Sequence, residues 1–180
     1  MRIISVHHNP VKIYPVKDRL YRIASNAKCC IRTDVGCLIY TANIGFKFDG
    51  RSGGKLVDWL VPNLGTQQET WAWLCHDILY YDFDISFETA NDLLRQQLVL
   101  DAGMSSWKAG LIKYSVDKFG RSSFGIDDSE DITNRKFINL EWMDDNRGLL
   151  ICQTIAFRND KNKLNNLEES SIEFRRKWAK

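Results

Sequence analysis

The sequence has no long run of apolar residues and no large excess of charge of either sign. Charges or amides interrupt every hydrophobic stretch before the ~18 apolar residues that a bilayer-spanning helix needs, and the apolar patch at the N-terminus is shorter than the core of a secretory signal. We therefore expect a soluble protein with no transmembrane segment. The 25 basic and 23 acidic side chains leave a formal net charge of +2, which argues against nucleic acid as a partner because such binders neutralise many phosphates.

Cysteine pairs with metal-ligand spacing are also missing. The five cysteines are Cys29, Cys30, Cys37, Cys75 and Cys152. Their number is odd and no Cys-x-x-Cys motif occurs, so a disulfide framework is not expected. We predict buried, reduced thiols.

Composition and local patterns predict a globular α+β fold. Apolar residues make up 44% of the 180 residues and charged residues 27%, which excludes a largely disordered or coiled-coil chain. Segments rich in Val, Ile, Tyr and Cys predict five short strands, at 2–6, 11–16, 19–24, 30–32 and 37–41. Their short connections predict an N-terminal antiparallel β-meander.

Capping residues predict a central block of three helices, at 66–81, 86–101 and 105–119. On the third of these helices, Trp107, Leu111 and Tyr114 recur at helical spacing and are predicted to be core residues. Two further strands, near 137–142 and 149–157, predict a C-terminal β-hairpin, and a mildly basic terminal helix is expected at 164–180. We expect a single domain over 1–180, in which 1–44 form the meander and 121–180 the hairpin and terminal helix.

The first predicted helix carries a group of polar and aromatic side chains that could form a catalytic site. Trp73, His76, Asp77 and Tyr80 share the helix face opposite its apolar stripe. An imidazole beside an acid in aromatic surroundings can act as a general base with a pKa near neutrality. Adjacent residues diverge by about 100° on a helix, so Asp77 is expected to bind a cation or a backbone group while another residue orients His76. The alternative is a structural role, in which these side chains satisfy neighbouring groups.

Two further features could complete such a site. Asn91 lies in the apolar stripe of the second predicted helix and needs a partner, which His76 or Tyr80 could supply as a donor; mere proximity to the surface is the alternative. Residues 45–54 are rich in glycine, whose backbone can curl around an ion. Asp49 in this segment and Asp77 could together bind Ca²⁺, which prefers carboxylate and carbonyl oxygens, although a plain flexible turn fits equally well.

Three blocks between residues 45 and 120 match the pattern of a known family. They are Gly45-Phe46-Lys47-Phe48-Asp49-Gly50-Arg51-Ser52, His76-Asp77-Ile78-Leu79-Tyr80 and Ala90-Asn91. This part of the chain resembles an uncharacterised family of tailed phages and prophages, catalogued as domain of unknown function 1353, and would be its family-like core. Asn91 stands where the family has an acid. The His-Asp-x-x-Tyr pattern is also similar to the active-site helix of phospholipases A2, in which the His activates water and the Asp binds calcium.

Two functions are compatible with these features. The first is a phage-encoded, calcium-dependent hydrolase of a host-envelope ester or amide, with catalytic His76, Asp77, Tyr80 and Asn91 and with Asp49 and Asp77 as metal ligands. In it Tyr80 supports the carboxylates, and the imidazole and acids must meet in one solvent-reachable hollow. The alternative is a non-catalytic virion protein of the tail, neck or capsid, which contacts other virion proteins through its terminal helix or strand edges. The expected location is the host cytoplasm during infection, and the virion in the second case.

Overall fold

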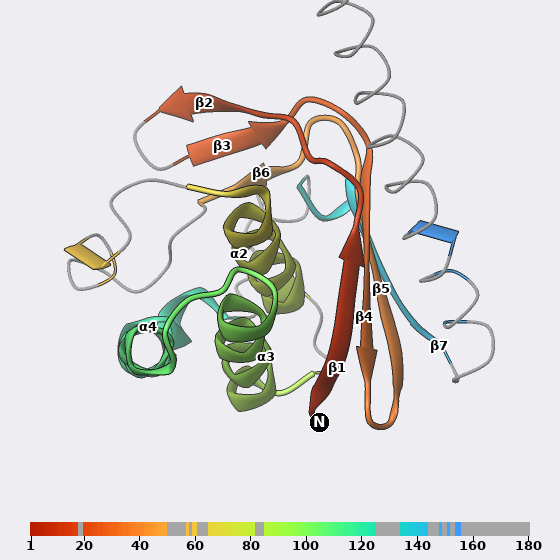
Figure 1. The fold of residues 1–180 in the computed structure, drawn as a ribbon. Coiled ribbons are helices and arrows are strands. Elements are labelled where there is room, and N and C mark those ends of the chain that lie inside the picture. The colour runs from red at the N-terminus through yellow and green to blue at the C-terminus, as the bar shows by residue number, and fades with distance from the viewer. Residues whose placement is uncertain are drawn as a thin grey trace, which may run out of the picture.

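The computed structural model describes residues 1–17, 20–49, 57, 59–60, 65–81, 85–124, 134–143, 148, 151 and 154–155. These residues form two antiparallel sheets and three long helices, which confirms the predicted α+β class. Strands come first, the helices occupy the centre of the chain, and one strand follows them (Figure 1). No helix in the described part of the chain is long and apolar enough to cross a membrane.

The larger sheet has four strands in the order β1-β4-β5-β7. They are β1 (Ile3–His8), β4 (Ala27–Thr33), β5 (Gly36–Ala42) and β7 (Ile138–Met143). A tight hairpin joins β4 to β5 at Gly36, whose φ of 147° favours glycine. The strand predicted at 137–142 is therefore confirmed as β7, which pairs with β5 along its whole length.

The smaller sheet has the order β2-β3-β6. It contains β2 (Ile13–Lys17), β3 (Leu20–Ile23) and the two-residue β6 (Lys47–Phe48). The N-terminal strands are thus antiparallel as predicted, but they are divided between two sheets. The chain leaves the larger sheet after β1 and returns to it at β4, which pairs directly with β1.

The three predicted helices form with nearly the expected ends. They are α2 (Gln67–Tyr81), α3 (Phe87–Leu100) and α4 (Ser106–Phe119). The capping box of α2 is present, because the Thr66 hydroxyl accepts from the Glu69 amide at 3.1 Å and the Glu69 carboxylate accepts from the Thr66 amide at 3.2 Å. Ser86 caps α3 through the Thr89 amide at 3.2 Å.

Helix α2 is buried on both sides, and this places the candidate site inside the molecule. Figure 1 shows α2 and α3 beside one face of the larger sheet, with α4 outside α3. Trp71, Leu74 and Ile78 of α2 pack in a core cluster with residues of both sheets. Trp73, on its other side, packs in a second cluster with residues of α3 and α4.

The prediction that Trp107, Leu111 and Tyr114 are core residues is wrong. Their exposed fractions are 64%, 36% and 57%. Helix α4 is the outermost of the three described helices, and it packs inward through smaller aliphatic residues, among them Ala109 and Ile112. The spacing of the large side chains was helical, as predicted, but it marks the outer face of α4.

The second strand of the predicted C-terminal hairpin, at 149–157, is also not formed where the structure describes it. Residues 151, 154 and 155 are helical, and Ile151 and Ile155 pack against Cys30, Cys37 and Ile39 on the other face of the larger sheet. Apolar residues four positions apart fit one face of a helix as well as one face of a strand. The helix predicted at 164–180 lies outside the described residues.

The cysteines differ in oxidation state. Cys29 and Cys75 are buried free thiols, and burial raises the pKa of the Cys75 thiol well above its usual value. Cys30 is disulfide-bonded. The expectation that all the cysteines are reduced is therefore wrong for Cys30.

Candidate functional site

The centre of the candidate site is His76, a side chain that is completely buried. Its ring has an exposed fraction of 0% and lies 4.3 Å, centroid to centroid, from the ring of Tyr80. The Trp73 ring meets it edge-on at 6.0 Å. The face of α2 that carries His76 is covered by α3 and α4, so the ring is not reached by solvent, contrary to what the hydrolase hypothesis expects.

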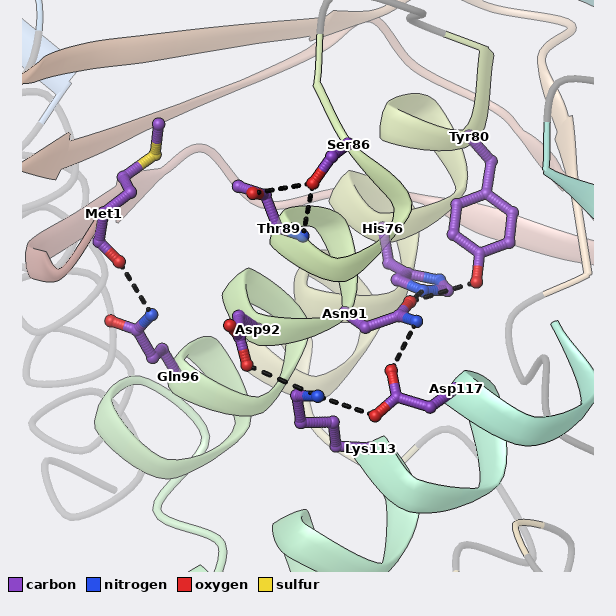
Figure 2. Close-up of polar contacts among 10 residues, drawn as sticks. All are labelled: Met1, His76, Tyr80, Ser86, Thr89, Asn91, Asp92, Gln96, Lys113 and Asp117. Carbon is purple, nitrogen blue, oxygen red and sulfur yellow. Dashed lines mark hydrogen bonds and ion pairs between the residues drawn. The ribbon is translucent and has the colours of Figure 1, made fainter. Parts of the chain in front are cut away.

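Asn91 of α3 joins the polar groups of this region. Its Oδ1 lies 2.8 Å from His76 Nε2 and accepts from the Tyr80 hydroxyl at 3.0 Å. Its Nδ2 donates to Asp117 Oδ1 at 2.8 Å, and Figure 2 shows the amide between the two α2 side chains and Asp117 of α4. The predicted contact of Asn91 with His76 or Tyr80 is therefore made with both. Tyr80 does not support the carboxylates as expected, since its hydroxyl donates to an amide oxygen.

These contacts favour the Nε2–H tautomer of His76. The ionised Asp117 carboxylate can only accept hydrogen bonds, so the donor end of the Asn91 amide must face it. The acceptor end then faces Nε2, which has to carry the ring proton. Nδ1 keeps its lone pair, and it is buried without a hydrogen-bond partner among the described residues.

The carboxylate nearest to this bare nitrogen is that of Asp77. Asp77 Oδ1 lies 3.5 Å from His76 Nδ1, too far and too poorly placed for a hydrogen bond between neighbours in a helix. Its Oδ2 accepts from the backbone N–H of Asp49 at 3.2 Å. Asp77 thus binds a backbone group while another residue orients His76, as the sequence predicts, and Asp49 is brought to the site at the end of β6.

Burial sets the protonation of both rings. It lowers the pKa of His76 to about 4, although the hydrogen bond to Asn91 and the charges of Asp49 and Asp117 act in the opposite direction. The imidazole is therefore neutral at physiological pH, and the expectation of a pKa near neutrality is wrong. Burial also raises the pKa of Tyr80, which keeps its hydroxyl protonated as a donor to Asn91.

The chemistry of Asp49 and Asp77 suits a hard cation, but these residues supply only part of a site. Ca²⁺ takes about 6–8 oxygen ligands, and the described residues contain no group of three or more His, Cys, Asp or Glu side chains arranged to hold a metal. Residues 50–54 of the glycine-rich segment lie outside the described residues. At its described end, Gly45 has a φ of 104° and Phe46 and Phe48 are buried in the core.

Two residues at the site are not found by the sequence analysis. They are Asp117, described above, and Lys113, whose Nζ lies 2.6 Å from Asp117 Oδ2 and 3.5 Å from Asp92 Oδ1. The i,i+4 spacing of Lys113 and Asp117 was a visible signal. It indicates an ion pair along one helix, however, and does not reveal that the pair faces Asn91.

Comparison with known proteins does not extend this picture. No protein-family model, curated protein or solved structure matches this chain. The resemblances to domain of unknown function 1353 and to the phospholipase A2 helix therefore remain predictions.

Proposed function

We propose that this protein is a phage-encoded hydrolase that uses His76 as a general base on an ester or amide of the host envelope. The observation that carries the proposal is the buried Nδ1 of His76, which has no hydrogen-bond partner among the described residues and lies beside a carboxylate. Such an atom is costly to bury without a partner. A hydrolytic water bound between Nδ1 and Asp77 would satisfy it.

In the proposed reaction Nδ1 removes a proton from that water. The oxygen attacks the carbonyl carbon of the substrate, the bond to the leaving group breaks, and the imidazolium returns the proton to the leaving group. Nε2–H stays bonded to Asn91 throughout. The negative charges of Asp49 and Asp117, which oppose the lowering of the His76 pKa by burial, stabilise the transient imidazolium.

Access to Nδ1 is proposed from the side of Asp77. The Asp77 side chain is 10% exposed while that of His76 is 0% exposed, so a water would reach Nδ1 only past Asp77, through a local opening of the helices that is part of this proposal. The same carboxylate and that of Asp49 would contribute oxygen ligands to a bound Ca²⁺, which would polarise the substrate carbonyl.

The test is hydrolysis of a panel of esters and amides by the purified protein, with Ca²⁺ or with a chelator. We expect His76→Gln to lower the rate by about 100-fold or more, the range for loss of a general base, and His7→Gln, on β1, to leave it unchanged. Calorimetry with Ca²⁺ should detect binding that Asp77→Asn weakens. The proposal fails if no substrate is hydrolysed, or if His76→Gln hydrolyses as fast as the wild type.

A second candidate is a non-catalytic virion protein, and the complete burial of His76 favours it. In this case the hydrogen bonds among His76, Tyr80, Asn91 and Asp117 hold α2, α3 and α4 in register, because buried polar networks favour one packing. Mass spectrometry of purified phage particles tests the idea. Detection of the protein in particles, together with no loss of any activity in His76→Gln, would support this role over the hydrolase.

A further inference from the structure

We propose that Asp117 is a positioning residue that fixes the tautomer of His76 through the Asn91 amide. For activity this inference rests on the proposed hydrolase, but the tautomer itself can be measured whether or not any reaction occurs. Asp117 does not touch His76. It acts through one side-chain amide that has a donor end and an acceptor end.

The geometry distinguishes the two orientations of that amide. In the observed one, Nδ2 donates to Asp117 at 2.8 Å, and Oδ1 accepts from Tyr80 at 3.0 Å and from His76 Nε2 at 2.8 Å. A 180° flip would place Oδ1 against the carboxylate, where two acceptors repel each other. Asn91 is completely buried, whereas the Asp117 side chain is 35% exposed, so solvent reaches the carboxylate but not the amide and relieves only part of that repulsion.

Lys113 keeps Asp117 in its role. Its ammonium group lies 2.6 Å from Asp117 Oδ2, on the oxygen that does not bind Asn91. The contact is a charge-assisted hydrogen bond in which the carboxylate is the acceptor. Figure 2 shows the resulting chain of contacts from α4 through Asn91 to the rings of α2.

A flip would reverse the chemistry of the imidazole. With Nδ2 facing His76, Nε2 would have to accept and the ring proton would move to Nδ1, toward Asp77 Oδ1 at 3.5 Å. The protonated Nδ1 could not take a proton from water. The orientation imposed by Asp117 therefore decides which nitrogen is basic.

The same contact explains why an amide suits position 91. An aspartate there would face the carboxylate of Asp117 at the 2.8 Å distance now spanned by a hydrogen bond, and the pair would have to hold an extra proton. A carboxylate at position 91 has two equivalent oxygens, however, and cannot present a donor to His76 when it is ionised. With Asn91→Asp in place, the tautomer should no longer depend on Asp117.

NMR of the whole protein measures the tautomer of His76 directly. The chain has three histidines, so the ring signals of His76 in ¹⁵N-labelled protein are identified by their loss in His76→Gln. We expect an unprotonated Nδ1 and a protonated Nε2 in the wild type. Asp117→Ala should populate the Nδ1–H tautomer at least tenfold above the wild type, and Asn91→Asp/Asp117→Asn should restore the Nε2–H form.

Two further variants keep the test decisive. If Asp117→Ala does not fold, Asp117→Asn is nearly isosteric and can offer Asn91 either end of an amide, so both tautomers should be populated. Asp92→Asn is the matched control, because Asp92 also contacts Lys113 but has no hydrogen bond to the Asn91 side chain among those described; it should leave the tautomer unchanged.

The inference is overturned if wild-type His76 carries its proton on Nδ1, or if the Asp117 variants that fold keep the wild-type tautomer. Its failure is distinguishable from that of the proposed function. A tautomer that responds to Asp117 in a protein that hydrolyses nothing supports the inference and refutes the hydrolase. In an active enzyme we expect Asp117→Ala to lower the rate by about tenfold or more, because the wrong tautomer cannot act as the base.

Discussion

At the scale of single residues, burial of His76 couples stability to pH. The pKa of His76 is lowered to about 4 in the folded protein, whereas the unfolded chain has a value near 6.5. Below pH 6.5 the unfolded state therefore binds a proton that the folded state does not, and stability falls as the pH drops toward 4. We expect a loss of about 2–3 kcal/mol between pH 7 and 4.5 from this residue, measured by urea unfolding.

The matched comparison is the same pair of measurements on His76→Gln. The carboxylates Asp34 and Glu88 also have lowered pKa values, but both proteins contain them, so their contribution cancels in the difference. The variant should be less stable than the wild type at pH 7 and should have a smaller pH dependence. An equal loss of stability in both proteins would show that His76 is not neutral and buried in solution.

Gly120 allows the Tyr80 hydroxyl to lie close to the backbone at the end of α4, where a larger side chain would clash. A Cβ at this position would lie 2.6 Å from the Tyr80 hydroxyl oxygen and 2.7 Å from the Val116 carbonyl oxygen, while its φ of −81° suits any residue. Gly120→Ala should destabilise the protein by about 1–3 kcal/mol, as overpacking does. Comparing the thermal unfolding of this variant with that of Gly120→Ala/Tyr80→Phe measures how much of the loss of stability is due to the clash with the Tyr80 hydroxyl.

Gly110 provides the control within the same helix. It lies inside α4, and a Cβ there would meet nothing within 4 Å. Gly110→Ala should therefore stabilise the protein by about 0.5–1 kcal/mol, the usual gain in a helix interior. If Gly120→Ala also stabilised the protein, the close approach of Tyr80 to the end of α4 would be wrong.

The residues of the site were predictable to different degrees. His76, Asp77 and Tyr80 lie on one helix, so their spacing alone placed them together, and Asn91 was visible as a polar residue in an apolar stripe. Asp117 was not visible, because its contact with Asn91 depends on how α4 is rotated and shifted against α3. The depth of His76 cannot be predicted for a similar reason: local spacing defines a helix face but not what covers that face.

At the scale of elements, α4 also shows that local sequence signals define a helix but not which of its faces is buried. Its ends follow from Ser105 and Gly120, which are local signals. Which of its faces points inward depends on α3, and the helix packs through Ala109 and Ile112 and leaves Trp107 outside. A sequence reading that assigns the largest apolar side chains to the core therefore selects the wrong face.

A pair of tryptophan substitutions tests this assignment. Trp107 is 64% exposed and Trp71 is 0% exposed, and the Trp71 indole also donates to the Asn9 carbonyl at 2.8 Å. Trp71→Ala should cost about 3–5 kcal/mol, the range for a large core residue. Trp107→Ala should change the free energy of unfolding by about 0.5 kcal/mol or less.

The measurement is urea unfolding of both variants under one set of conditions. A large loss of stability in Trp107→Ala would mean that the outer face of α4 is covered in solution. Comparison at several protein concentrations would then show whether a second copy covers it.

At the scale of the whole molecule, the α+β class follows from the composition and from the spacing of apolar residues, but the order in which the strands pair does not. Short links between neighbouring strands predict a meander, and the β2–β3 and β4–β5 hairpins fulfil this expectation locally. The pairing of β1 with β4 skips an entire hairpin. Such a pairing depends on the helical layer, which holds the segment between β1 and β2 in place.

Gln67, at the start of α2, holds the segment that connects β1 of the larger sheet to β2 of the smaller one. Its Oε1 accepts from the Val11 amide at 2.8 Å and its Nε2 donates to the Val11 carbonyl at 3.0 Å, while Val11 itself is only 2% exposed. Gln67→Leu leaves both buried backbone groups without these partners and should cost about 2 kcal/mol or more. The Val11 amide should then exchange with solvent at least tenfold faster, as hydrogen-exchange NMR can measure.

Gln67→Glu separates the two bonds. The carboxylate still accepts from the Val11 amide, but its second oxygen would lie against the Val11 carbonyl, where two acceptors repel each other. The amide should therefore exchange more slowly than in Gln67→Leu, while the stability loss should be at least as large. If Gln67→Leu left the exchange of Val11 unchanged, the crossing between the two sheets would have to be held by other contacts, such as the Trp71 bond to Asn9. Trp71→Phe, which keeps the ring packing and removes that bond, would then become the variant that speeds exchange.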